Sequence, residues 1–185
     1  MGTLDILVSE LEPVTASGHP PVHLWNPERK GEIDIIIQYD GSWLHEGGLI
    51  KRQALVNLFS SVLWFEDGEH YLKTPAEQLK ITVETTPFLM TQLSVENSGT
   101  PEQTIILTSS YDDVIILGED NPLWIDQSVI SGQEVPLVGI RYGMAGRLTS
   151  SMLHELVNLG EVVSDNNSEY LRLISRGFTF DLSIG

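Results

Sequence analysis

The sequence of 185 residues contains no cysteine, which excludes disulfide bonds, thiolate metal sites and cysteine nucleophiles. It also contains no apolar run close to the roughly 18 residues that a membrane-spanning helix requires. The N-terminus has no basic region followed by an apolar segment, so a secretory signal is not expected. These absences favour a cytoplasmic protein that does not associate with membranes.

Basic residues are scarce, and the formal net charge is −16. Lysine and arginine are completely absent between Ile81 and Ile140, although acidic residues occur throughout that stretch. Such a surface repels polyanions, so a nucleic-acid polymer is not an expected partner. A solvated acidic surface is one explanation of this charge. Binding of a basic partner or a cation is the other.

Apolar residues make up 41% of the chain, enough for a packed core, and part of their pattern occurs twice. Residues 47–84 are matched by residues 146–183. The matched positions in the first copy, which recur 98 or 99 positions later, are Ile50, Leu55, Leu58, Phe59, Tyr71, Leu72, Leu79, Ile81 and Val83. One extra residue between helix and strands explains the change of offset. The sequence therefore indicates an internal duplication.

The first copy has the pattern of a helix over residues 51–64, followed by strands around 71–73 and 79–84. Apolar residues recur at helical spacing in the helix, and they alternate with polar residues in the last strand. A strand is also predicted over residues 31–38, where isoleucine is abundant. Asp40-Gly41 follows it as a tight hairpin turn.

The second half shows a similar order. Strands are predicted over residues 104–108, 114–117, 123–125 and 137–142, and a helix runs from Thr149 or Ser150 to Leu159. Thr149 or Ser150 would cap that helix, and Gly160 would end it. A closing hairpin follows over residues 170–182.

Strands outnumber helices, and no parallel strand–helix–strand series is visible. We therefore predict an α+β fold with two tandem antiparallel-sheet domains, each carrying one helix. Residues 1–23 form an N-terminal arm or linker because prolines and glycine interrupt them. The domains span residues 24–96 and 97–185, divided at the loop-like stretch 97–101.

Several short motifs resemble the bacterial domain-of-unknown-function 1285 family. The similarity covers most of residues 25–95 and continues more loosely to Phe180. The motifs are Gly31-Glu-Ile-Asp34, Asp40-Gly-Ser-Trp43, Ile50-x-Arg52-x-x-Leu55-Val56-x-Leu58-Phe59-Ser60, Tyr71-x-x-Thr74-Pro75-x-Glu77 and Val83-Glu84-x-x-Pro87-Phe88.

The resemblance implies a duplicated α+β fold whose second domain superficially resembles pleckstrin-homology folds. It also implies a ligand site between the two domains, with a proposed nucleotide-like ligand and a role in signal transduction. The chain departs from the family at Ser150, where a basic residue matching Arg52 is common. A phosphate-binding role is therefore not carried over to that side.

Motifs for catalysis or metal binding are incomplete. His154-Glu155 begins the zinc-protease pattern HExxH, but the second histidine position holds Asn158. His19 and His23 have helical spacing, but the prolines between them prevent a helix. The glycines at 143 and 146 precede a helix and are more typical of a turn than of an anion site. We therefore predict no catalytic residue, no metal and no cofactor.

The remaining candidates are a few cations in an acidic chain, with polar residues that the two copies do not share. If the cations converged with Trp43 in one cleft, arginine would hold an anion and the indole would stack on a base. These cations are Lys51, Arg52, Arg141 and Arg147. Pairing of these arginines with neighbouring acids is the alternative. The candidate ligand-binding residues are Asp34, Trp43, Glu46, Arg52, Thr74, Glu77, Arg141 and Arg147.

Three functions follow as hypotheses. The first is a non-enzymatic regulatory module that senses a small anionic, nucleotide-like ligand at the interface of its two domains. The second is a protein–protein adaptor that acts through strand edges or the acidic middle region. The third is a metal-assisted hydrolase that uses Asp34 and Glu46.

Overall fold

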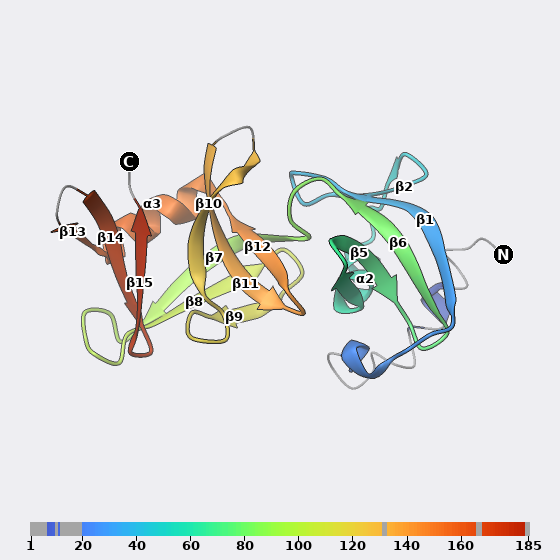
Figure 1. The fold of residues 1–185 in the computed structure, drawn as a ribbon, viewed down its shortest axis with the longest axis horizontal. Helices are drawn as coiled ribbons and strands as arrows, with labels where there is room; N and C mark the ends of the chain where they lie inside the picture. Colours follow the sequence, from blue (N-terminus) through green and yellow to red (C-terminus); the bar gives the residue numbers. More distant parts are fainter. Residues whose placement is uncertain (1–6, 10, 12–19, 131–132, 166–167, 184–185) are drawn as a thin grey trace. The chain divides into compact units, whose positions relative to one another are not determined.

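The chain forms two compact units, Met1–Glu84 and Thr85–Gly185, in the computed structural model (Figure 1). The structure describes residues 7–9, 11, 20–130, 133–165 and 168–183. Each unit contains a curled mixed sheet and an α-helix. The predicted α+β fold with two tandem domains is thus confirmed.

The first unit contains a six-stranded sheet in the order β3-β2-β1-β6-β5-β4. Its helix α2 spans Gln53–Ser61, and a short 3₁₀ helix, η1, spans Val22–Leu24. The strands are β1 (Arg29–Ile37), β2 (Trp43–His45), β3 (Gly48–Leu49), β4 (Leu63–Glu66), β5 (Glu69–Lys73) and β6 (Glu77–Val83). Strands β1 and β6 are parallel, and the other neighbours are antiparallel.

Helix α2 packs its apolar face into the core of this unit. Val56 and Phe59 are buried, and the ring of Phe59 stacks on Trp43 with 6.2 Å between centroids. Leu7 and Leu11, one helical turn apart, are also fully buried. These two residues of the predicted arm therefore belong to the core, whereas residues 1–6, 10 and 12–19 lie outside the described residues.

The predicted hairpin at Asp40-Gly41 is present between β1 and β2. Gly41 has φ 84°, a left-handed conformation that glycine adopts without strain. The Asp40 carboxylate accepts a hydrogen bond from the Ser42 N–H at 2.9 Å. Hydrogen bonding to Ser42 lowers the pKa of Asp40. The turn thus forms where its local chemistry predicts it.

The first helix is shorter than predicted, because α2 ends at Ser61 and β4 begins at Leu63. Residues 63–66 are mainly large and aromatic, which suits a strand. Asp67 and Gly68 form the turn between β4 and β5 with φ 52° and 82°.

The second unit contains a six-stranded sheet in the order β10-β11-β12-β7-β8-β9 and a three-stranded sheet in the order β13-β14-β15. Helix α3 spans Ser150–Leu159. The first sheet has β7 (Phe88–Glu96), β8 (Thr104–Ser109), β9 (Val114–Ile116), β10 (Leu123–Ile130), β11 (Gln133–Arg141) and β12 (Met144–Leu148). The second has β13 (Glu161–Asp165), β14 (Ser168–Ser175) and β15 (Phe178–Ser183).

Strand β7 marks a difference from the predicted domain limits. Its residues were expected to lie in the first domain, which was predicted to span residues 24–96. In the structure β7 pairs with β8 and β12, and the division falls between Glu84 and Thr85. The β7–β12 pair joins segments that are distant in the sequence, so no local sequence pattern predicts it.

The internal duplication is visible in the order of elements. Helix α2 is followed by the antiparallel strands β4, β5 and β6, and α3 is followed by β13, β14 and β15. The prediction of purely antiparallel sheets was wrong for one pair in each six-stranded sheet, β1–β6 and β7–β12. Strands β3, β4, β12 and β13 were also not predicted.

The ends of α3 show what two predicted capping residues do. The Thr149 hydroxyl accepts a hydrogen bond from the Met152 N–H at 3.4 Å, as an N-cap does. Gly160 has φ −97°, so no left-handed conformation requires glycine there. A Cβ at position 160 would lie 2.6 Å from Leu171 Cδ1 and 2.8 Å from the Arg172 carbonyl oxygen. Gly160 is needed because β14 approaches closely.

A buried serine connects the two sheets of the second unit. Ser175, at the end of β14, is 0% exposed. Its hydroxyl donates to the Leu117 carbonyl at 2.8 Å and accepts from the Ile105 N–H at 3.0 Å. Next to it, the Arg176 N–H donates to the Gln103 carbonyl at 2.8 Å. The tip of the β14–β15 hairpin is therefore held beside the start of β8.

Among the described helices, none is sufficiently long and apolar to cross a membrane.

Candidate functional site

Three candidate residues of the first unit are structural. Trp43 is 1% exposed and packs on Phe59, so its indole is a core group and has no open face for a ligand. Thr74 is fully buried in the turn between β5 and β6. Its hydroxyl accepts hydrogen bonds from the Ala76 and Glu77 N–H groups at 3.1 and 3.0 Å. Thr74 thus closes the turn that leads into β6.

Glu77 lies in the same turn region, and its carboxylate is buried. It forms an ion pair with the exposed Arg29 at 3.3 Å. These two residues face each other because β1 and β6 are in register at Arg29 and Glu77. Of the candidates in this unit, Thr74 and Glu77 are brought together, and their contacts explain local structure.

The other three candidates of the first unit are exposed. Glu46 lies in a turn with φ 49°, and Arg52 is the N-cap residue of α2 without a side-chain capping bond. Asp34 lies where the register between β1 and β6 shifts. It borders a hollow of about 450 Å³ whose other lining residues are Glu32, Ile33, Lys80, Ile81 and Thr82.

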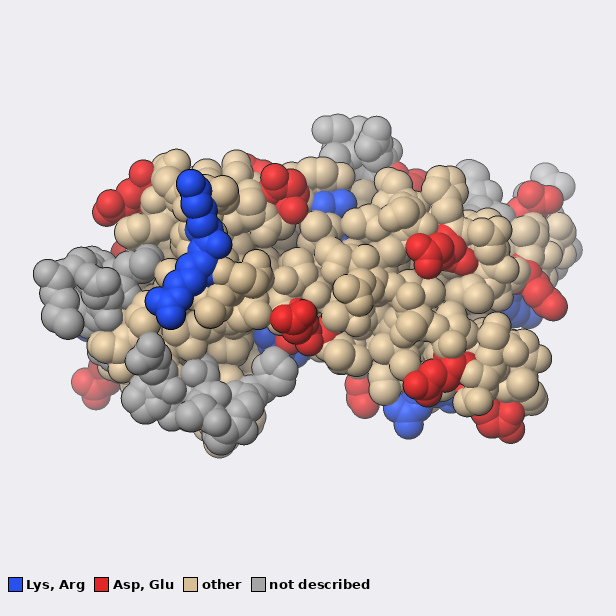
Figure 2. Space-filling model, turned by 180° about the vertical axis from the view of Figure 1, so that it is seen from behind, with Lys and Arg blue, Asp and Glu red and all other residues tan. Residues whose placement is uncertain are grey.

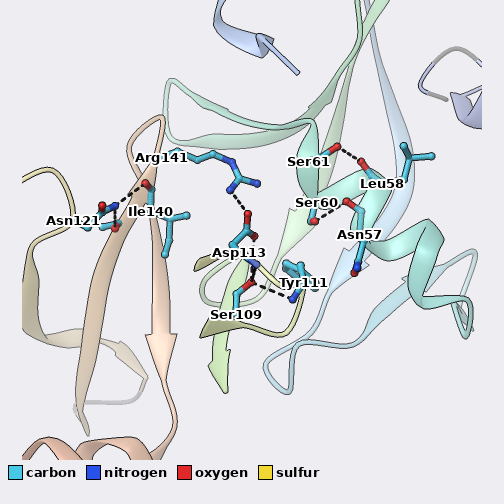
Figure 3. Close-up of polar contacts among 11 residues, drawn as sticks. Asn57, Leu58, Ser60, Ser61, Ser109, Tyr111, Asp113, Asn121, Ile140 and Arg141 are labelled. Atoms are coloured by element: carbon cyan, nitrogen blue, oxygen red, sulfur yellow. Dashed lines mark hydrogen bonds and ion pairs between the residues drawn. The ribbon is translucent and has the colours of Figure 1, made fainter. Parts of the chain in front are cut away.

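In the second unit, Arg141 forms an ion pair with an acidic residue (Figure 3). Its guanidinium donates to Asp113 at 2.7 Å and lies 4.8 Å from the ring centroid of Phe88. The Ser109 hydroxyl donates to Asp113 at 3.2 Å and accepts from the N–H groups of Tyr111 and Asp113. The group fastens the β8–β9 connection, so Arg141 follows the alternative in which arginine pairs with an acid.

Arg147 is buried on β12, next to Leu137 of β11 and Leu89 of β7 in the sheet register. Metal binding finds no support in the geometry of the described residues, because no three His, Asp or Glu side chains gather there as a metal site would need. The spacing of His19 and His23, which the sequence analysis did not take as a metal site, includes His19, which lies outside the described residues.

A different feature of the second unit has the character of a binding site. Strand β9 is the last strand of its sheet and pairs only with β8 among the described strands. Backbone bonds join Asp113 to Ser109 and Leu117 to Ile105. Because bonding alternates along an antiparallel pair, the N–H and C=O groups of Val114 and Ile116 point away from β8.

The side chains along this edge are apolar and exposed. Val114 is 64% exposed and Ile116 is 37% exposed. Phe178, at the start of β15, is 41% exposed. Together with a turn after β9, they surround a hollow of about 380 Å³, which we call the β9 hollow. It is lined by Val114, Ile116, Gly118, Glu119, Asp120, Asn121, Arg176 and Phe178.

Local hydrogen bonds position this hollow. The Gly118 N–H donates to the Asn121 carbonyl, which closes the turn after β9. The Asn121 amide donates to the carbonyls of Gly139 and Ile140 at 2.8 and 3.1 Å (Figure 3). On the opposite wall, Ser175 holds the hairpin that carries Arg176 and Phe178. Both walls of the hollow are therefore fixed to the sheet.

The second unit, which carries the hollow, is acidic. Residues 85–185 contain thirteen acids against four arginines and no lysine. Acidic groups are spread over a mainly uncharged surface in Figure 2. Within the hollow, Glu119 and Asp120 are exposed, and neither forms an ion pair with a described residue. Arg176 is the one cation in its lining.

The candidate list from the sequence did not include these residues. The adaptor hypothesis had named strand edges and the acidic middle region, where β9 lies. A usable signal was present in Val114-Ile115-Ile116, an apolar strand flanked by acid pairs at Asp112-Asp113 and Glu119-Asp120. What the sequence did not show is that β9 is an edge strand, or that Phe178 lies beside it.

Comparisons with known proteins show similarity to one family and to two solved structures. Residues 20–86 match the N-terminal domain, and residues 87–182 the C-terminal domain, of a domain of unknown function (DUF1285). The crystal structure of a DUF1285 family protein from Silicibacter pomeroyi DSS-3 is 34% identical, with a TM-score of 0.83 over 96% of this chain and 94% of that one. The crystal structure of a DUF1285 family protein from Shewanella baltica OS155 is 20% identical, with a TM-score of 0.53. That match covers 69% of this chain and 92% of that one. No curated protein matches.

Proposed function

Since the chain belongs to the DUF1285 family, whose description states no function, we propose from its own geometry that it is a non-enzymatic protein-binding module. Its second unit takes up an extended segment of a partner protein along β9. The observation that supports this most strongly is an edge strand whose outward backbone groups lie beside three exposed apolar side chains.

Strand addition uses both features of the edge. Outward N–H and C=O groups of Val114 and Ile116 supply hydrogen bonds to an incoming backbone, which give affinity without regard to sequence. Side chains of the added strand that face the same way as Val114 and Ile116 then enter the β9 hollow. The apolar contacts among these side chains supply part of the binding free energy.

A second copy of this chain fits the edge less well than another protein. Edge strands commonly carry charges that prevent pairing between copies. Here exposed acids flank β9 on both sides, Asp112 before it and Glu119 and Asp120 after it, so two copies would bring like charges together. The flanks therefore act against self-association.

Binding of a small anionic ligand has weaker support. Trp43, predicted to stack on a base, is a core residue. Arg141 is ion-paired with Asp113, and Arg147 is buried within a sheet. Of the residues expected to bind this ligand, Trp43, Arg141 and Arg147 thus have structural roles within their own units, and Arg52 is exposed.

The test uses the full chain and a capped nine-residue peptide, called the lysine peptide. It has threonine at odd positions, valine at positions 4 and 6, and lysine at positions 2 and 8. In an added strand, the valines and lysines share one face, and a lysine reaches the acids in either direction. We expect nuclear magnetic resonance (NMR) titration to shift the amide signals of residues 114–118 and 176–178.

Two controls make the result specific. N-methylation at alternate residues of the peptide removes the backbone N–H donors that would face β9. We expect this change to abolish binding. Val114→Lys should weaken binding about tenfold, whereas Val162→Lys should not, since Val162 is an equally exposed valine on β13. Both variants add the same charge. Unchanged binding of the N-methylated peptide would refute strand addition.

A further inference from the structure

The structure assigns a basic side chain to the β9 hollow: we infer that the partner segment places a lysine or arginine between Phe178 and the carboxylates of Glu119 and Asp120. This inference rests on the proposed strand addition at β9. It adds the chemistry of the partner, which the edge alone leaves open.

The hollow presents two carboxylates that form no ion pair with a described residue. Glu119 and Asp120 follow β9 directly and line the hollow with exposed side chains. Both side chains are therefore available to an incoming charged group. In contrast, Asp113 on the other flank already holds Arg141. An incoming cation thus has two acceptors at one end of the edge.

The aromatic wall suits the same kind of side chain. Phe178 is 41% exposed, and its Cδ2 lies 3.9 Å from the position that a Cβ on Gly118 would take. The ring therefore stands over a glycine, with no side chain between it and the turn. A cation is attracted to the face of an aromatic ring, and the methylene groups of lysine or arginine pack against it.

Arg176 is the group that opposes this assignment. It lines the same hollow, and its backbone is fixed by the bond from its N–H to the Gln103 carbonyl. Two carboxylates against one guanidinium still leave the hollow acidic. Residues 81–140 add no lysine or arginine that would offset this charge. Arg176 therefore weakens the attraction for a cation without reversing it.

Replacing the acids of the hollow and replacing its arginine should have opposite effects on the affinity for the lysine peptide. Exposed ion pairs contribute modestly, so Glu119→Gln or Asp120→Asn should each weaken binding of the lysine peptide about two- to fivefold. Arg176→Gln should strengthen it by about twofold, because it removes the competing cation. Salt should weaken binding of the lysine peptide to the unaltered chain and have less effect on the double variant of Glu119 and Asp120.

The experiment compares the lysine peptide with versions in which both lysines are glutamine or both are glutamate. NMR titration of the full chain measures the three affinities. We expect the order lysine, glutamine, glutamate, from strongest to weakest, with Glu119→Gln/Asp120→Asn removing most of the difference. Amide signals of residues 118–120 should shift more with lysine than with glutamine.

The outcomes separate the two proposals. If all three peptides bind equally and N-methylation abolishes binding, strand addition stands and the basic partner is wrong. If the glutamate peptide binds best and Arg176→Gln weakens it, the hollow takes an acidic side chain and the inference is overturned. If no peptide shifts the signals of residues 114–118, both proposals fail. Concentration-dependent dimers that shift these signals without peptide would identify a second copy as the occupant.

Discussion

Ser175→Ala is predicted to destabilise the second unit strongly, although it removes one oxygen atom. The Ser175 hydroxyl is fully buried and joins the Ile105 N–H to the Leu117 carbonyl. Alanine leaves both backbone groups without this partner. An unsatisfied buried group costs about 1–3 kcal/mol, so the free energy of unfolding should fall by about 2–4 kcal/mol.

Urea unfolding measures this change, provided that the two units are followed separately. Trp124 lies in the second unit, whereas the other three tryptophans, Trp25, Trp43 and Trp64, lie in the first. Two units need not unfold in one transition, so the Trp124 signal should be isolated by replacing Trp25 and Trp64 and subtracting a Trp124→Phe reference.

Ser183→Ala is the matched control, because Ser183 is an exposed serine on the neighbouring strand β15. Its effect should stay within about 0.5 kcal/mol. Ser175→Ala should also shift the amide signals of residues 176–178, because the hairpin that carries Phe178 loses its attachment. A loss below about 0.5 kcal/mol at Ser175 would contradict the view that this hydroxyl joins the two sheets.

Three further predictions concern other positions. Burial lowers the pKa of His70 below its ordinary value of 6.5. Below pH 6.5 the unfolded chain therefore binds a proton at His70 more readily than the folded chain does. Stability should therefore fall as the pH drops from about 6.5 toward the folded pKa, and His70→Gln should reduce this loss in urea unfolding at pH 7.5 and 5. Gly160→Ala should cost about 1–3 kcal/mol in thermal unfolding, since its Cβ would meet a backbone oxygen at 2.8 Å, whereas Gly118→Ala should be nearly neutral. Arg141→Gln should destabilise the second unit by roughly 2–3 kcal/mol, and adding Asp113→Asn should recover part of this loss in a double-mutant cycle; strictly additive effects would contradict the ion pair.

The sequence predicted those parts of the fold that local patterns determine. The duplication was visible because core residues of a helix and its following strands recur at nearly constant spacing. The Asp40-Gly41 turn and the Thr149 cap also followed from short-range chemistry. In contrast, β4 and β13 were missed because they are short strands that follow a helix almost directly. The parallel pairs β1–β6 and β7–β12 join distant segments and leave no local signal.

The candidate site was less predictable for a related reason. Trp43 and Thr74 belong to conspicuous motifs, but motif residues in this chain maintain the core and a turn. Arg141 attracted attention as a rare cation, and its rarity did not reveal the bond to Asp113. The β9 hollow depends on a serine at position 175 that places Phe178 beside Gly118, so it becomes visible only when the fold is known.

Amide hydrogen exchange at Ile116 is the most direct test of strand addition at β9. Because its N–H points away from β8, we expect fast exchange in the free chain and slow exchange when the lysine peptide is bound. The Ile115 N–H bonds inward and should exchange slowly in both states. Slow exchange at Ile116 in the free chain, or no change on binding, would contradict the proposal that β9 is an open edge that receives a partner strand.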